Sequence, residues 1–205
     1  MQAIDFLFVG AILIMSVVIH EISHGYAALL FGDRTAEYEG RLTLNPLKHL
    51  DPVGSVLVPI ISYMTAGMLF GWAKPGPYNP YNFTIANRRL GEAIVAGAGP
   101  LANIVIALVF SLLIRVFGET LSYSFISIAG LLVYTNILLA LFNLTPIPPL
   151  DGSKILFSFL PPLGGSRVFL EKNGFILALV FLFFLWPLLT PFISSLFSLI
   201  TGIPL

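Results

Sequence analysis

The chain has 205 residues, of which 57% are hydrophobic and 10% are charged, and its mean hydropathy is +0.95. Soluble domains have about 25% charged residues, so this composition excludes an ordinary soluble protein and indicates an all-α polytopic membrane protein. The equal numbers of basic and acidic residues, 10 of each, give no indication of a nucleic-acid partner, and the lack of cysteine excludes disulfides and thiolate metal ligands.

Five apolar stretches follow one another along the chain, and each approaches or exceeds the roughly 20 residues that cross a bilayer as a helix. They are residues 6–31, 53–72, 93–114, 125–144 and 175–200. The second stretch contains Pro59 and Gly67 and leads into Lys74-Pro75-Gly76-Pro77, so it is either an additional span or a re-entrant segment buried against protein. We predict a single integral-membrane domain over residues 1–205.

The distribution of basic residues favours a re-entrant second stretch. If all five stretches cross, the 10 lysines and arginines divide four against six between the two sides. If residues 53–72 re-enter, only Arg115 is separated from the other nine, an asymmetry that fits the positive-inside rule. We therefore expect four crossings, with both termini outside and the connections 32–92 and 146–173 in the cytoplasm.

The first stretch contains the motif His20-Glu21-Ile22-Ser23-His24, which holds the only acidic, basic or histidine side chains between Phe6 and Phe31. Two histidines four residues apart share one helix face, so their rings can bind one tetrahedral metal ion, with the intervening glutamate as general base. The alternative is a chance match to the motif, but three polar groups without partners in lipid would cost several kcal/mol. The pattern predicts metal-hydrolase chemistry within the membrane.

A metal ion held by two histidines needs a third protein ligand and leaves a fourth position for water. Asp151 follows a proline-rich stretch that ends the fourth apolar stretch, whereas the other carboxylates lie at segment ends or in polar connections. In the four-crossing topology Asp151 falls towards the same cytoplasmic half as the two histidines. We predict Asp151 as the third ligand; capping of the following helix is the alternative, and the two roles can coexist.

Three segments together resemble the site-2 protease family of intramembrane zinc metalloproteases, peptidase family M50. They are His20-Glu21-Ile22-Ser23-His24, Gly99-Pro100-Leu101-Ala102-Asn103 and the stretch from Asn143 to Gly152. The similarity extends from about residue 6 to residue 160, and it is closest to the compact prokaryotic members without a PDZ or CBS domain.

This resemblance implies one Zn²⁺ per chain, bound by His20, His24 and Asp151, with Glu21 as the catalytic base. It implies a three-helix catalytic core made of residues 6–31, 93–114 and 125–144, with residues 53–72 and 175–200 as accessory segments. The implied activity is hydrolysis of a peptide bond in or near a transmembrane helix of a membrane-protein substrate. The implied location is the lipid bilayer of a prokaryotic cytoplasmic membrane, where a separate regulatory membrane protein is a further expected partner.

Two asparagines are candidates for contact with the substrate. Asn143, at the membrane end of its span, is an amide donor for substrate backbone or for the developing oxyanion. Asn103 lies beside small residues that permit close helix approach, so its sequence context leaves substrate contact and an interhelical hydrogen bond open as alternatives. Asn136 we interpret as an interhelical hydrogen bonder.

An extended segment is needed to hold an unwound substrate. Residues 38–45 contain a period-two alternation that predicts a short β-element, whose edge would pair with substrate at Leu42 and Leu44. The proline-rich segment from Lys74 to Pro80 is a second extended candidate, with Lys74 as a substrate contact.

Two other functions remain open from the sequence. A membrane metal transporter would be expected to contain inverted repeats or several ligands along a path, and neither is evident. A catalytically silent zinc-binding scaffold would be expected to lose the glutamate of the motif first, and Glu21 is present.

Overall fold

The computed structural model describes residues 3–58, 61, 64, 74, 76–160 and 165–205, and these residues form helices and loops without a strand. The α-helices are α1 (Ala3–Leu30), α2 (Thr35–Tyr38), α4 (Arg88–Phe117), α5 (Tyr123–Asn143), α6 (Asp151–Phe159), α7 (Gly165–Val180) and α8 (Trp186–Thr201). The shorter elements are the 3₁₀ turns η1 (Pro46–Lys48) and η3 (Pro80–Asn82) and the π-helical turns η2 (Pro52–Leu57) and η4 (Phe181–Leu185). The predicted all-α class is confirmed.

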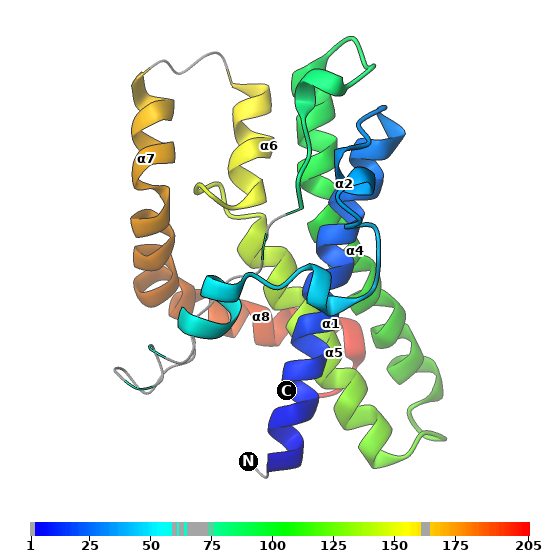
Figure 1. Cartoon of the computed structure of the whole chain (residues 1–205). Coiled ribbons are helices and arrows are strands. Elements are labelled where there is room, and N and C mark those ends of the chain that lie inside the picture. The colour runs from blue at the N-terminus through cyan, green and yellow to red at the C-terminus, as the bar shows by residue number, and fades with distance from the viewer. Residues whose placement is uncertain (1–2, 59–60, 62–63, 65–73, 75, 161–164) are drawn as a thin grey trace.

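Helices α1, α4 and α5 pack together as the predicted three-helix core, and Figure 1 shows α4 running opposite to α1 and α5. Small residues allow the backbones to approach, and those of α4 and α5 include the buried Ala96, Ala107, Ala129 and Ala140. The interior of the core also holds polar side chains, which the next subsection describes.

Within the described ranges, four helical segments are long and apolar enough to cross a membrane. They are Phe8–Leu30, Arg88–Phe117, Tyr123–Asn143 and Arg167–Thr201, which match the four predicted crossings. Of the predicted accessory segment 53–72, the structure describes the turn η2 and a few residues after it, and most of the segment lies outside the described residues. Whether it crosses or re-enters stays a prediction.

The last span is bent. The π-helical turn η4 separates α7 from α8, Pro187 is the second residue of α8, and Figure 1 shows the two helices meeting at an angle. A π-helical turn and a proline both interrupt the regular hydrogen bonds of a helix, which explains a kink at this position. Helix α8 packs on α4 and α5 through the buried side chains of Ile193 and Phe197.

The predicted β-element at residues 38–45 is wrong. Tyr38 ends α2, and the backbone N–H groups of Gly40 and Arg41 donate back to Glu37 O and Ala36 O at 2.9 and 2.8 Å. Gly40 has a φ of +63°, the left-handed conformation that terminates helices, so the chain turns where an edge strand was expected. Of the alternating apolar residues, Leu42 packs against Gly25 of α1, whereas Tyr38 and Leu44 are exposed.

Candidate metal centre

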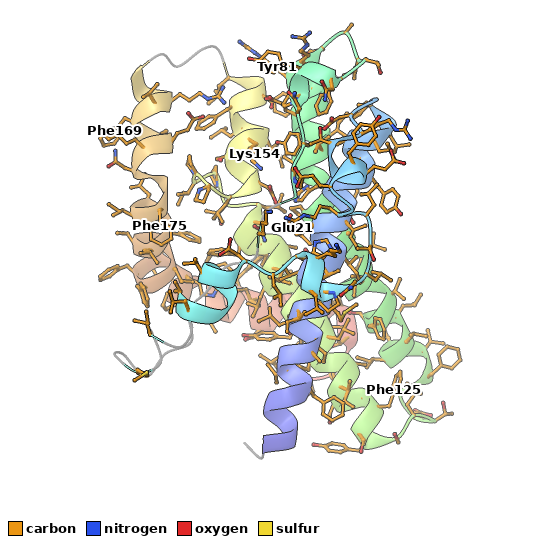
Figure 2. The ribbon with its side chains drawn as sticks, in the orientation of Figure 1. Glu21, Tyr81, Phe125, Lys154, Phe169 and Phe175 are labelled. Atoms are coloured by element: carbon orange, nitrogen blue, oxygen red, sulfur yellow. The ribbon has the colours of Figure 1, made fainter. Side chains whose placement is uncertain are left out.

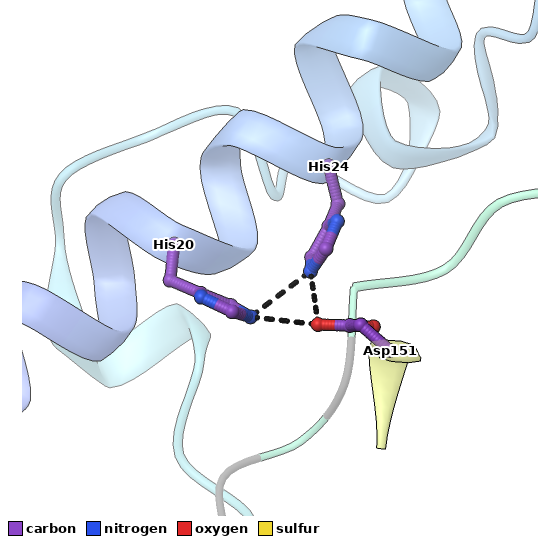
Figure 3. Close-up of side chains that lie close together, drawn as sticks. All are labelled: His20, His24 and Asp151. Atoms are coloured by element: carbon purple, nitrogen blue, oxygen red, sulfur yellow. Dashed lines mark hydrogen bonds and ion pairs between the residues drawn. The ribbon is translucent and has the colours of Figure 1, made fainter. Parts of the chain in front are cut away.

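Three ligand-type side chains meet at one point between α1 and α6 (Figure 3). The Nε2 atoms of His20 and His24 are 3.0 Å apart, and each lies 3.1 Å from Oδ2 of Asp151. All three residues are buried, with 5 to 6% of their surface exposed. Tetrahedral zinc holds nitrogen and oxygen ligands at about 2.0–2.1 Å, so its ligand atoms stand about 3.3 Å from one another. This triangle, which we call the ligand triangle, has nearly that size.

Each histidine uses its other ring nitrogen to fix the ring. His24 Nδ1–H donates to the carbonyl oxygen of Val95 at 2.6 Å, and His20 Nδ1–H donates to Oδ1 of Asn103 at 2.7 Å. Because a carbonyl oxygen only accepts, these bonds place the ring proton on Nδ1 and leave both Nε2 atoms as free acceptors. Metal-binding histidines are usually held this way, so the donor set fits a transition-metal ion.

Two facing stripes of residues explain how the helices meet. Ser16, His20 and His24 are four residues apart along α1, and Val95, Gly99 and Asn103 are four apart along the antiparallel α4. Gly99 lies opposite the two imidazoles, since a Cβ at this position would come within 2.5 Å of His24 Nε2 and 2.6 Å of His20 Nε2. A residue without a side chain therefore leaves room for an ion at the ligand triangle.

Asn103 belongs to a buried polar network that joins three helices. Its Nδ2 donates to Oδ1 of Asn136 at 2.8 Å, and Nδ2 of Asn136 donates to Oγ of Ser16 at 2.9 Å. Both asparagines have 0% of their surface exposed. The interhelical role of Asn136 is confirmed, and Asn103 occupies the interhelical position that the sequence left open.

Asp151 reaches the histidines because the turn after α5 holds the start of α6 against the end of α5, and α6 then packs on α4. The connecting segment is a proline-rich turn with a cis Pro148–Pro149 bond, and a Cβ on Gly152 would lie 2.1 Å from the carbonyl oxygen of Leu144. Asp151 is the first helical residue of α6, and Leu150 is the N-cap residue without a side-chain cap bond. The carboxylate therefore does not cap its helix, and the capping alternative is wrong.

The charges around the site favour an ionised Asp151. Burial by itself would raise the pKa of Asp151, but its close contacts with His20 and His24 and the positive charge of Lys154 outweigh burial and hold the pKa well below its usual range. Lys154 Nζ lies 3.5 Å from the second carboxylate oxygen, Oδ1, and above the ring of Tyr78 at 5.3 Å. Asp151 is thus a carboxylate at neutral pH, the form that binds metal.

Glu21 stands between the two histidines on α1 and is half-buried. Its Oε2 accepts a hydrogen bond from the backbone N–H of Gly76 at 2.6 Å, and Figure 2 places it in the middle of the molecule, with Lys154 above. Backbone groups such as this N–H and the Val95 carbonyl carry no side-chain signal, so sequence patterns miss them. Lys154 had a signal, because it follows Asp151 by three residues and so shares its helix face.

The chain is similar to a known family and to named bacterial proteins. The family model described as Peptidase family M50 matches residues 113–187. Two bacterial proteins carry the name "Putative zinc metalloprotease". YwhC of Bacillus subtilis is 39% identical over 207 residues, covering 93% of this chain and 90% of its own length. Rip2 of Mycolicibacterium smegmatis is 33% identical over 178 residues, covering 86% of this chain and 67% of its own length.

The chain belongs to peptidase family M50, the site-2 protease family. No solved structure matches it. The predicted membership is confirmed, and the ligand triangle joins two of the three segments on which the resemblance to this family rests, His20 to His24 and the stretch ending at Gly152.

The remaining predicted site residues of this M50 protein are not members of the ligand triangle. Asn143 Nδ2 donates to the carbonyl oxygen of Leu139, one turn back in α5, at 2.9 Å. Leu42 is half-buried, whereas Leu44 and Lys74 are exposed, and the backbone N–H of Lys74 donates to His49 O at 2.9 Å. Contact of these four residues with a substrate stays a prediction.

Proposed function

We propose that this protein is a zinc-dependent endopeptidase that hydrolyses a peptide bond in or near a transmembrane helix of a membrane-protein substrate. The observation that carries the proposal is the ligand triangle, which lies on an apolar helix of spanning length with both imidazoles fixed for metal binding. Ionisable groups in such helices are costly and mark functional sites.

His20, His24 and Asp151 would hold one Zn²⁺ per chain. When bound, the ion supplies a Lewis acid that polarises the scissile carbonyl and makes water more acidic. Glu21, on the same helix, accepts a proton from the attacking water and then delivers it to the leaving amine. We assign Asn143 as an amide donor to the substrate, which requires its Nδ2 to exchange the bond to Leu139 for one to the substrate.

The charge distribution supports a cytoplasmic orientation of this site. The histidines lie in the second half of the first span, which is its cytoplasmic half in the four-crossing topology. Nine of the ten basic residues lie in the connections 32–92 and 146–173 on that same side. We propose that the protein resides in a prokaryotic cytoplasmic membrane, surrounded by lipid, and that water enters from the cytoplasmic side. A regulatory membrane protein would then act from within the same bilayer.

The described residues favour hydrolysis over transport. Among them, His20, His24 and Asp151 are the one group of three ligand-type side chains close enough to hold an ion, whereas a transport path needs successive ligands. The presence of Glu21 on the same helix as the two histidines supports an enzyme over a silent scaffold.

The substitution Glu21→Gln tests the function. The purified protein in detergent is incubated with a panel of single-span membrane proteins, and cleavage and zinc content are measured for the wild type and the variant. We expect about one zinc per chain in both, with cleavage reduced by about 10² to 10⁴ in the variant because a general base contributes about this factor. Chelation should abolish cleavage by the wild type.

A matched control is Glu171→Gln, which changes an exposed carboxylate on α7 that pairs with Arg167. It should cleave like the wild type. Equal cleavage by Glu21→Gln with zinc bound would contradict the role of Glu21, and no cleavage of any substrate by the zinc-loaded wild type would contradict the function.

A further inference from the structure

The segment from Gly76 to Asn79 lies against the proposed catalytic glutamate. The N–H of Gly76 donates to Glu21 Oε2 at 2.6 Å, across 55 residues of sequence. Gly76, Pro77 and Tyr78 are each half-buried. A charge-assisted hydrogen bond of this length is among the stronger ones in proteins, so it restricts where the carboxylate can turn.

The local sequence makes this N–H a unique donor. In Lys74-Pro75-Gly76-Pro77 the prolines carry no backbone N–H, so Gly76 provides the one amide hydrogen between Lys74 and Tyr78. A Cβ at residue 76 would lie 3.2 Å from Glu21 Oε2 and 3.3 Å from Glu21 O, so glycine allows the backbone to approach this closely.

Contacts on both sides of Gly76 hold the donor in place. The N–H of Lys74 donates to His49 O at 2.9 Å, and the N–H of Asn79 donates to Oδ2 of the buried Asp33 at 2.7 Å. Between them, the ring of Tyr78 lies below Lys154 Nζ, which in turn lies 3.5 Å from the carboxylate of Asp151. The segment is therefore attached to the end of α1 and to α6, the two helices that carry the ligand triangle.

We propose that Gly76 is a positioning residue for catalysis: its N–H fixes Oε2 of Glu21 and leaves Oε1 to accept the proton from water. This inference rests on the proposed function, in which Glu21 is the base. The opposite interpretation, that the segment blocks Glu21 and inhibits the enzyme, predicts the opposite change in activity when the bond is lost.

The variants Gly76→Pro and Gly76→Ala distinguish the effect of losing the hydrogen bond to Glu21 from the effect of adding a side chain at residue 76. Proline removes the N–H, whereas alanine keeps it and adds a Cβ near Glu21. We expect kcat to fall about 10- to 100-fold in Gly76→Pro, the factor for losing a hydrogen bond to a charged group, with KM and zinc content close to those of the wild type. Gly76→Ala should retain at least about tenfold more kcat than Gly76→Pro.

A second measurement needs no cleavage. Hydrogen exchange of the Gly76 amide is compared between the wild type and Glu21→Ala, with the Asn79 amide, which is bonded to Asp33, as internal control. We expect the Gly76 amide to exchange at least about tenfold faster in Glu21→Ala and the Asn79 amide to be unchanged, because the first amide alone loses its acceptor.

Unchanged exchange at Gly76, or cleavage by Gly76→Pro that equals or exceeds that of the wild type, would overturn the inference. The comparison of cleavage requires a wild type that cleaves, whereas the exchange measurement requires no cleavage assay. A zinc-loaded wild type without cleavage would instead contradict the proposed function.

Discussion

At the scale of single residues, the two histidines of the site are fixed by different partners. His24 bonds to the backbone carbonyl of Val95, which no substitution removes, whereas His20 bonds to the side chain of Asn103. Asn103 in turn is held by Asn136. The orientation of His20 therefore depends on a side-chain network that mutagenesis can reach.

Replacing Asn103 should weaken metal binding. Asn103→Leu leaves His20 Nδ1–H without an acceptor, and loss of such a partner typically reduces metal affinity about 10- to 100-fold. Asn103→Asp keeps an oxygen acceptor and should retain most of the affinity. Competition with a chelator of known zinc affinity measures the change. Asn173→Leu, on the exposed part of α7, is the control, and equal zinc affinity in Asn103→Leu would refute the role of this bond.

At the scale of elements, Asp33 connects the end of α1 to the segment that precedes α4. Its carboxylate accepts hydrogen bonds from Thr35, Asn79 and Asn82, and 1% of its surface is exposed. Burial by itself would raise the pKa of Asp33, but these hydrogen bonds outweigh it and lower the pKa below its usual value. The bonds favour the charged form, so protonation weakens them.

The sign of this shift predicts how stability depends on pH. A carboxyl group whose pKa is lowered in the folded state stabilises the protein at pH values above the pKa of that group in the unfolded chain, about 3.9. This contribution is lost as the pH falls through the folded-state pKa. The difference in unfolding free energy between the wild type and Asp33→Asn should therefore be constant above about pH 5 and shrink below about pH 4. Unfolding in detergent across this range measures it, and a difference independent of pH would contradict the assignment.

The elements also indicate what the sequence could and could not predict. The motif from His20 to His24 was predictable because the helix period alone puts both rings on one face. The prediction of a strand at residues 38–45 was wrong because an alternation over seven residues does not specify a partner strand. The left-handed Gly40 instead follows the end of a helix there. The Gly76 contact was not predictable, because a backbone N–H has no residue-type signal.

At the scale of the whole molecule, the site is assembled from α1, α4, α5 and α6. The four crossings followed from hydropathy and charge, and the choice of Asp151 as third ligand followed from the same topology. The network of Ser16, Asn103 and Asn136 was harder to foresee, because the packing of three helices decides which polar faces meet. The sequence indicated an interhelical role for Asn136 and left one open for Asn103, but it did not indicate that Ser16 joins them.

The position of the cut in a substrate tests the central claim most directly. A single-span membrane protein is incubated with the wild type, and the masses of both products are determined. We predict a scissile bond within or at the edge of the substrate's apolar segment, lost in Glu21→Gln and on chelation. Cuts confined to the soluble flanks of the substrate, or the same cut made by Glu21→Gln, would contradict intramembrane proteolysis by this site.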